Sequence, residues 1–270
     1  MNTTLASLHI YPIKSCAQLT LDSAVVETRG LAHDRRWMIV DQNARFITGR
    51  ELPQMTLLQA EPGAGGLTLR APQMVSLHVA FPLANTARLD VTVWKNIVAA
   101  QLADASANVW LSTFLARPCR LVFMDDDCVR AVEIEHALAG DEVSFADAYP
   151  LLMISQAALD GLNARLARPV GMWQFRPNLV VAGCEAHAED RWSRIRIGEI
   201  EFDVVKSCTR CVFTTVDPAR GEFSADGEPL RTLIGYRRTP AGVTFGQNVI
   251  ARGQGVIRAG DAIDVLEHLL

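Results

Sequence analysis

The sequence predicts a mainly-β, barrel-like protein with a small helical complement. Between residues 41 and 100, short apolar segments are separated by turn signals such as 62–66 and 94–96, a spacing typical of an antiparallel sheet or barrel. Helical periodicity is confined to a few stretches. Strands do not alternate with helices in the way that builds a parallel sheet. The chain also contains no internal repeat and no low-complexity tract.

The individual elements follow from alternation and turn chemistry. We expect strands over 5–10, 24–27, a segment that becomes apolar at Trp37, 120–124, a hairpin over 195–205, 243–251 and 262–266. Helices are expected over 105–116, from Ser155 as N-cap to about 167, and from near Pro229. The core face of the first helix would consist of Val109, Leu111, Phe114 and Leu115.

A pair of cysteines three residues apart, Cys208 and Cys211, is the most distinctive motif of the chain. Lys206 and Arg210 flank the pair. Neighbouring cations favour the thiolate, which is both the nucleophile and the metal ligand. The β-branched run 212–216 predicts a strand after the motif. We therefore expect Cys211 at the mouth of that strand, in a loop that carries positive charge.

Four interpretations of this pair can be compared. A structural zinc site needs four ligands, but the other cysteines are scattered singly and the histidines are not paired. A thioredoxin-like dithiol places its second cysteine on a helix, whereas this motif runs into a predicted strand. The other two are a half-buried structural pair and a single thiolate ligand to a metal carried by a cofactor. The motif alone leaves these last two open.

Three other polar pairs stand beside predicted strands. They are Lys14 with Ser15, Asp34 with Arg35, and Arg176 with Asn178. A lysine, an arginine fork and an amide at strand entrances suit an anionic or polar ligand. The alternatives are a solvated turn for the first pair, an ion pair at a barrel rim for the second, and an arginine that ties down loop carbonyls for the third.

The composition is that of a soluble globular protein. The chain has 270 residues, nearly half of them apolar, and a net charge of −4, which argues against a nucleic-acid polymer or a membrane surface as partner. Six cysteines without framework spacing favour a reducing compartment. We find no secretory leader and no apolar run near the roughly 18 residues of a membrane span. The expected location is the cytoplasm.

Five short motifs occur in an order that resembles the MOSC-domain proteins. They are Y-P-I-K-S-C at 11–16, H-D-R-R-W at 33–37, F-R-P-N-L-V-V at 175–181, C-T-R-C-V-F-T-T-V-D-P at 208–218 and F-G-Q-N at 245–248. Within that family the chain is similar to the mitochondrial amidoxime reducing component and its bacterial YcbX-type relatives over almost its whole length. The resemblance implies a MOSC β-barrel over 121–270. A smaller β-rich MOSC N-terminal domain over 1–120 would precede it and contribute to a cofactor cleft.

The resemblance also implies a molybdenum cofactor, in which molybdopterin carries the metal. The family's molybdenum ligand, the second cysteine of C-x-R-C, maps to Cys211, and an acidic residue that assists proton delivery maps to Asp147. Where the mitochondrial relatives carry small hydroxyl residues, this chain has Ala148 and Tyr149. The expected cofactor contacts are Lys14, Ser15, Arg35, Tyr149, Arg176, Asn178, Thr209 and Arg210. The lysine and arginines would neutralise the pterin phosphate.

The activity that the resemblance implies is two-electron reduction of N-hydroxylated compounds: hydroxylamines, amidoximes or N-hydroxylated bases. The alternative is a non-catalytic module that binds, carries or sulfurates the cofactor. The 270 residues contain no iron–sulfur C-x₄-C-x₂-C run, so no iron–sulfur cluster is expected in the chain. They also contain no nucleotide-binding G-x-G-x-x-G motif. Electrons are expected from a separate ferredoxin, flavin reductase or cytochrome. The aspartates at 125–127 are either its docking surface or a solvated loop.

Overall fold

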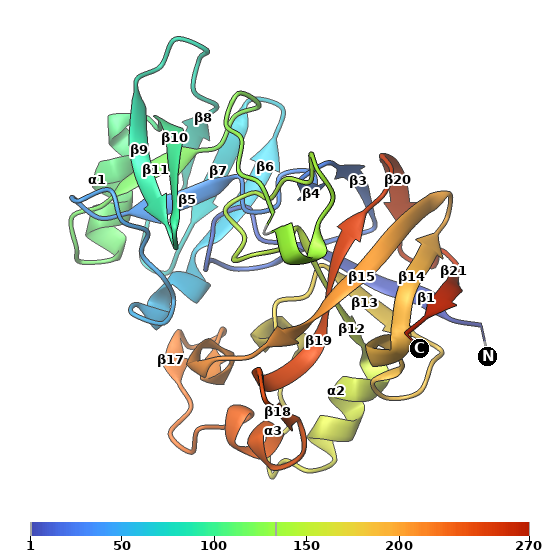
Figure 1. Ribbon diagram of the computed structural model, residues 1–270. Helices are drawn as coiled ribbons and strands as arrows, with labels where there is room; N and C mark the ends of the chain where they lie inside the picture. The colour runs from blue at the N-terminus through green and yellow to red at the C-terminus, as the bar shows by residue number, and fades with distance from the viewer. Residues whose placement is uncertain (1, 133, 270) are drawn as a thin grey trace.

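The computed structural model describes residues 2–132 and 134–269, and most of its regular structure is β-strand. Figure 1 shows two lobes. One carries α1 and the strands drawn in cyan and green, and the other carries the late strands together with the N-terminal strand β1. The predicted fold class, mainly β with a few helices, is confirmed. None of the described helices is long and apolar enough to cross a membrane.

The larger lobe is built on a mixed sheet that begins with strands from the start of the chain. Its order is β2-β1-β13-β12-β19-β15-β14-β21, with β18 paired to β19. The bounds are Leu19–Leu21 (β2), Thr4–Ile10 (β1), Leu179–Ala182 (β13), Leu151–Ser155 (β12), Gly242–Ala251 (β19), Ile200–Thr209 (β15), Trp192–Ile197 (β14), Ile263–His268 (β21) and Arg238–Thr239 (β18). A second sheet has the order β20-β3-β4, over Gly255–Arg258, Ser23–Glu27 and Gly30–Leu31. Leu8, Phe202 and Val249 belong to the core of this lobe.

The smaller lobe consists of two antiparallel sheets and one helix. The first sheet has the order β5-β11-β10-β9 and the second β6-β7-β8. The bounds are Trp37–Val40 (β5), Arg120–Phe123 (β11), Asn96–Leu102 (β10), Arg88–Val93 (β9), Gln59–Gly63 (β6), Gly66–Arg70 (β7) and Leu77–Ala80 (β8). Trp37, Leu69 and Leu111 belong to one buried cluster that joins these elements.

The chain crosses from the larger lobe to the smaller one between β1 and β5. β1 pairs antiparallel with β13 of the larger lobe, whereas β5 pairs with β11 of the smaller one. The predicted domain boundary at 120/121 falls inside β11. The segment that joins β1 to β5 therefore lies where the lobes meet, and it contains Lys14, Ser15 and Arg35.

The helix α1, Ala105–Phe114, confirms the first predicted helix but not its whole core face. Asp104 is its N-cap, and its side chain accepts from the backbone N–H of Ser106. Leu111 is fully buried, whereas Val109 is 68% exposed, so its predicted burial is wrong. At 100° per residue Val109 points away from the stripe that Leu111 shares with Ala107, four residues earlier.

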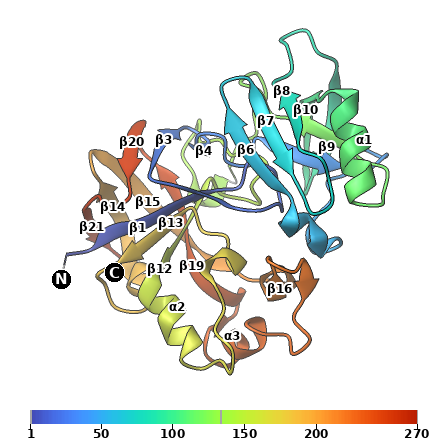
Figure 2. The same cartoon turned by 180° about the vertical axis from the view of Figure 1, so that it is seen from behind.

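The helix α2, Gln156–Asn163, connects two parallel strands. The N-cap Ser155 accepts from the N–H of Ala158 as predicted, although the helix ends four residues before the predicted 167. β12 and β13 pair parallel, and α2 packs beside both, as Figure 2 shows. The expected absence of parallel βαβ alternation therefore has an exception in this unit. The expected short helix is α3, Leu230–Tyr236.

The run 212–216 after the cysteines forms a 3-10 turn over Val212–Thr215, not the predicted strand, and only Val216–Asp217 is extended, as β16 paired with β17 (Glu222–Phe223). The hydroxyls of Thr214 and Thr215 donate to the carbonyls of Cys211 and Val212. Such local side-chain bonds compete with a ladder and hold the turn. The remaining 3-10 turns are Pro53–Leu57, Ile134–His136, Met172–Gln174 and Ala188–Arg191.

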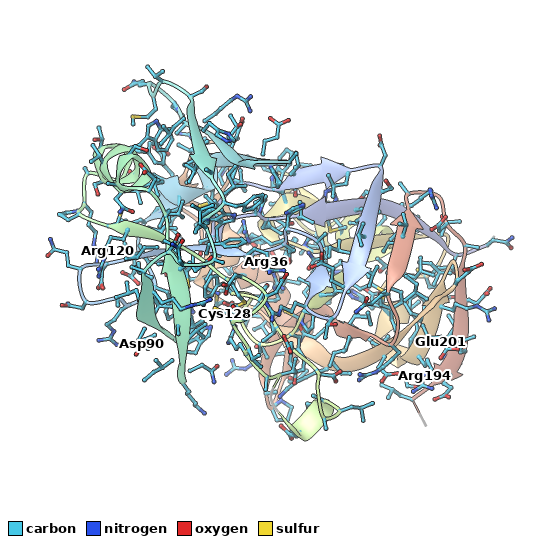
Figure 3. The ribbon with its side chains drawn as sticks, turned by 90° about the horizontal axis from the view of Figure 1, so that it is seen from above. Arg36, Asp90, Arg120, Cys128, Arg194 and Glu201 are labelled. Atoms are coloured by element: carbon cyan, nitrogen blue, oxygen red, sulfur yellow. The ribbon has the colours of Figure 1, made fainter. Side chains whose placement is uncertain are left out.

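The acidic run 125–127 is partly neutralised within the fold. Arg88 contacts the carboxylates of Asp125 and Asp127, and Arg36 contacts that of Asp126. Figure 3 labels Arg36 and Cys128 close together near the middle of the molecule. The run is therefore part of an ion-pair network, and its charge is less available for a partner than a free acidic loop would be.

Candidate functional site

A single cleft between the lobes is lined by all of the residues that the family resemblance assigns to the site. They are Lys14, Ser15, Arg35, Asp147, Tyr149, Arg176, Asn178, Thr209, Arg210 and Cys211. Counting its open mouth, the cleft holds about 880 Å³ of space. The predicted convergence of Lys14, Arg35, Arg176 and Cys211 is therefore present in the fold, although these residues come from both ends of the chain.

Lys14 is a buried cation on the floor of the cleft. Its backbone N–H donates to the carbonyl of Trp37, 2.9 Å away, which fixes the segment that follows β1. The side chain is buried, and Nζ donates to the carbonyl of Phe145 (2.8 Å) and to Oδ1 of Asp147 (2.5 Å). Burial lowers the pKa of Lys14, and Asp147 opposes that shift. The ammonium is thus held in one place with most of its water removed.

Arg35 forms the ion pair of one interpretation, with Asp34, and it also lines the cleft. Its Nη1 donates to Asp34 (2.6 Å) and to Oδ1 of Asn178 (3.0 Å). Asp34 is only 1% exposed and also accepts from the backbone N–H of Tyr11 (2.8 Å). A carboxylate without access to water fixes the direction of the guanidinium. Asn178 is fixed in turn by its contacts with Arg35.

Arg176 has donor capacity that the described residues do not use. Its Nη1 donates to the carbonyl of Cys16 (2.6 Å), and its guanidinium lies over the ring of Tyr11, 4.0 Å from the centroid. Burial lowers the pKa of Arg176 to about 10. Its Nη2 and the Nε of Arg210 are buried and have no hydrogen-bond partner within 2–132 and 134–269. Buried guanidinium N–H groups without an acceptor favour an anionic ligand here.

Three of the cleft residues have a strained backbone conformation. Ser15, Arg35 and Arg176 have φ values of 69°, 48° and 58°. Residues other than glycine seldom adopt this left-handed region, which costs on the order of 1–3 kcal/mol each unless the surroundings enforce it. The hydrogen bonds of Arg35 and Arg176 supply that enforcement. A relaxed backbone at these three positions would aim their side chains elsewhere.

The two cysteines of the motif have different surroundings. Cys211 is exposed and forms the N-cap position of the 3-10 turn, just beyond the end of β15. The sulfur of Cys208 is half-buried, packs against a core cluster and accepts from Nη1 of Arg210 at 2.9 Å. In the described part of the chain, no three His, Cys, Asp or Glu side chains gather as a metal-binding group. Cys211 is therefore the thiol that faces the cleft with the most freedom to bind.

Asp147 is an ionised carboxylate at the cleft mouth. Its side chain is 71% exposed and accepts from Nζ of Lys14 and from Nε1 of Trp94, 3.3 Å away. Burial of the group acts to raise its pKa, but Lys14, Arg50 and Arg35 outweigh this and lower it well below the usual range. Tyr149, two residues on, is buried with its ring 6.5 Å from that of His136.

Several cleft residues escaped the sequence-based selection. They are Thr48, Arg50, Gln174, Phe213, Thr214 and Asn248. The sequence around Gly49 could have pointed to the site. After the apolar Ile47, the glycine stands between the hydroxyl of Thr48 and the cation of Arg50. A Cβ at Gly49 would lie 2.2 Å from the ring of Phe213, so the close contact between the lobes depends on glycine.

Comparison with protein families identifies both halves of the chain. Residues 2–118 match the MOSC N-terminal beta barrel domain, and residues 140–264 match the MOSC domain. Mitochondrial amidoxime-reducing component 1 of Danio rerio is 37% identical over 274 residues, which cover 96% of this chain and 83% of the relative. The chain belongs to this MOSC-domain family. The human protein of the same name is 32% identical over 97% of this chain and 83% of its own length.

The family also includes proteins that act on the cofactor itself. The molybdenum cofactor sulfurase of Solanum lycopersicum is 29% identical over 90% of this chain, and the match covers 32% of the sulfurase. Membership of the MOSC family thus implies involvement of the molybdenum cofactor. Two classes of relative, reductive and sulfur-handling, accordingly share this fold.

The cleft fits such a cofactor by the chemistry of its donors. The unused N–H groups of Arg176 and Arg210, with the ammonium of Lys14, match a phosphate. The exposed thiol of Cys211 matches a soft metal. These two kinds of group line one cleft, as a ligand with a phosphate and a metal would require.

Proposed function

We propose that this MOSC-family protein is a molybdenum-cofactor-dependent reductase of N-hydroxylated compounds. The observation that carries the proposal is the presence of the exposed thiol of Cys211 in the same cleft as the buried cation Lys14 and the half-buried cation Arg176. The names of the relatives, amidoxime-reducing components, support the substrate class. Hydroxylamines and N-hydroxylated bases carry the same N–OH group and belong to the proposed range.

Each group of the cleft has a proposed part in holding the cofactor. Lys14, Arg35 and Arg176, with the hydroxyl of Ser15, would bind the phosphate, and Asn178 and Arg210 would bind its polar neighbours. Cys211 would be the single protein ligand of the molybdenum. Tyr149 and Thr209 would border the pterin. When bound, the cofactor supplies the transfer of two electrons to the substrate.

The reaction needs two protons as well as two electrons. For an amidoxime, R–C(=NOH)–NH₂ + 2 e⁻ + 2 H⁺ gives R–C(=NH)–NH₂ + H₂O, in which the N–O bond breaks and its oxygen leaves as water. Because Asp147 is ionised at neutral pH, it would act as an acceptor that orients water or a substrate N–H. We propose that protons enter from solvent along the exposed side of Asp147.

The two electrons would come from a separate redox protein of ferredoxin, flavin reductase or cytochrome type. Such encounters are small and steered by charge, so turnover should fall as ionic strength rises. The run 125–127 is a weak choice for the docking surface because Arg36 and Arg88 already pair with its carboxylates. We favour the cleft mouth, where the electrons are needed. The cytoplasm stays the proposed location.

A second candidate function is handling of the cofactor without turnover, which the similarity to sulfurases favours. Reduction of benzamidoxime by the molybdenum-loaded protein, with dithionite-reduced methyl viologen as electron source, separates the two. A reductase converts many equivalents to benzamidine. A carrier or sulfur-transfer module gives no more product than the free cofactor, and that result would overturn the proposal. A Cys211→Ser preparation with its cofactor content measured serves as the control.

A further inference from the structure

Trp94 occupies a backbone position that favours glycine. It is the first residue of the two-residue loop between β9 and β10, whose last pair is Val93 with Asn96. Its φ is +54°, and glycine is preferred at such a position in hairpin loops. A bulky aromatic residue there costs on the order of 1–3 kcal/mol. The hairpin would form more easily with glycine, so turn geometry does not explain the tryptophan.

The tip of this hairpin reaches the cleft mouth from the opposite lobe. Nε1 of Trp94 donates to Oδ1 of Asp147 (3.3 Å), and the guanidinium of Arg50 lies over its ring at 4.7 Å. Both of these partners line the cleft. The hairpin is also anchored through Arg130. The Nε of Arg130 donates to Oδ1 of Asn96 (3.1 Å), and its Nη2 donates to the carbonyl of Asp147 (2.8 Å).

Core packing does not explain Trp94 either. The residue remains 42% exposed, although Phe46 contacts its ring at a centroid distance of 5.1 Å. A tryptophan kept for the core would be covered on most of its surface. Here the open part of an indole lies beside an ionised carboxylate whose side chain is 71% exposed. An aromatic surface next to a carboxylate suits a planar group with N–H donors and an apolar ring.

We infer that Trp94 determines substrate specificity by forming the wall against which the aromatic part of an amidoxime rests. The inference rests on the proposed function and specifies its substrate class. The N–H donors of the amidoxime head group face Asp147, and the ring attached to its carbon packs on the indole. Aryl amidoximes are therefore favoured over hydroxylamine, which has no ring to place there.

The test compares two substrates in one pair of proteins. Trp94→Gly removes the indole and gives the loop its preferred residue, so the variant should fold. The ratio of kcat/KM for benzamidoxime to kcat/KM for hydroxylamine should fall about tenfold, the size of effect expected for one aromatic contact. Trp94→Phe, which keeps a ring, should recover much of the ratio. Trp173→Gly is the matched control, because Trp173 is 48% exposed but, among the described residues, makes no hydrogen bond to Asp147 and no ring contact with Arg50, as Trp94 does.

A ratio that is the same in the wild-type protein and in Trp94→Gly would overturn the inference. A wild-type protein that reduces neither substrate would instead contradict the proposed function. In that case the dissociation constant of benzamidine, measured by calorimetry on the molybdenum-loaded protein, still tests the wall. It should rise about tenfold in Trp94→Gly and stay the same in Trp173→Gly, and an unchanged value in Trp94→Gly would overturn the inference. If Trp94→Gly does not fold, Trp94→Asn, which also tolerates positive φ, takes its place.

Discussion

The two sides of the cleft differ in how much of their geometry is complete in the folded chain alone. On one side, Lys14, Arg35 and Arg176 are held by hydrogen bonds of 2.5 to 3.0 Å to carboxylates, an amide and carbonyls. On the other side, Cys211 is exposed and stands on a short 3-10 turn. The cation side is therefore organised in advance, whereas the thiol side is open.

This difference suggests an order of events for cofactor binding. Lys14 is buried, and Arg35 and Arg176 are half-buried and held by hydrogen bonds, so an anionic group that enters meets donors that need little rearrangement. A thiol open to solvent can then bond to the metal after the phosphate is seated. We therefore expect substitutions on the cation side to remove the cofactor. Substitutions on the thiol side should leave the cofactor bound, but with the wrong ligand at the metal.

The largest effect should come from Lys14→Met, which keeps the length of the side chain and removes the ammonium. We expect molybdenum and pterin content to fall at least tenfold, because a phosphate would lose its most buried cation. The free energy of unfolding should fall by about 1–2 kcal/mol, since the carbonyl of Phe145 loses its donor. Metal analysis and urea unfolding measure the two quantities.

The control for that variant is Arg70→Met. Arg70 pairs with Glu61 at the surface, where both side chains are about half exposed, and should contribute less than about 1 kcal/mol. Full cofactor content in Lys14→Met would show that the buried cation does not bind the cofactor. The comparison between the two sides of the cleft would then have no basis.

A smaller loss of cofactor is expected from Gly49→Ala, which acts on the thiol side through packing alone. The added methyl would meet the ring of Phe213, so this ring, or the cysteine turn that carries it, must shift, at a cost of about 1–3 kcal/mol. Activity should fall more than cofactor content does. Thermal unfolding and metal analysis on one preparation check this. Gly63→Ala is the control, because nothing lies within 4 Å of a Cβ there. Equal loss of stability in both variants would contradict the proposed contact.

The smallest effect concerns the pH dependence of stability through Asp147. Its pKa is lower in the folded chain than the ordinary value of about 3.9, so its ionised form stabilises the fold above that pH. This contribution is lost as pH falls through and below that value. It should be below about 1 kcal/mol because the side chain is largely exposed. Between about pH 5 and about pH 2.5, the free energy of unfolding should decline less steeply in Asp147→Asn than in the wild-type protein. Parallel curves for the two proteins would argue against this contribution.

The sequence was informative where a functional residue sits next to a strand end. Lys14, Arg176 and Cys211 each follow or precede a recognisable apolar run, and the five motifs place them in one family. The left-handed φ of Arg35 and the contact of Gly49 with Phe213 depend on partners far away in the chain, and no local pattern encodes them.

Two local predictions failed because side-chain hydrogen bonds and tertiary contacts outweighed propensity. β-branched content pointed to a strand over 212–216, but the hydroxyls of Thr214 and Thr215 bond to carbonyls three residues earlier and hold a turn. The parallel pairing of β12 with β13 was missed because α2 is short and β12 is not bounded by clear turn signals on both sides. The sequence shows Trp94 only as part of a turn, because its hydrogen bond to Asp147 joins two lobes and no local pattern encodes such a contact.

Ligation of molybdenum by Cys211 is the central claim, and X-ray absorption at the molybdenum edge tests it most directly. Wild-type protein, Cys211→Ser and Cys208→Ser would be purified from a host that makes the cofactor, and the number of sulfur neighbours of the metal would be compared. We predict one sulfur fewer in Cys211→Ser, because a hydroxyl is a harder ligand, and the wild-type number in Cys208→Ser. The wild-type number in Cys211→Ser, or the same loss in both variants, would contradict the account.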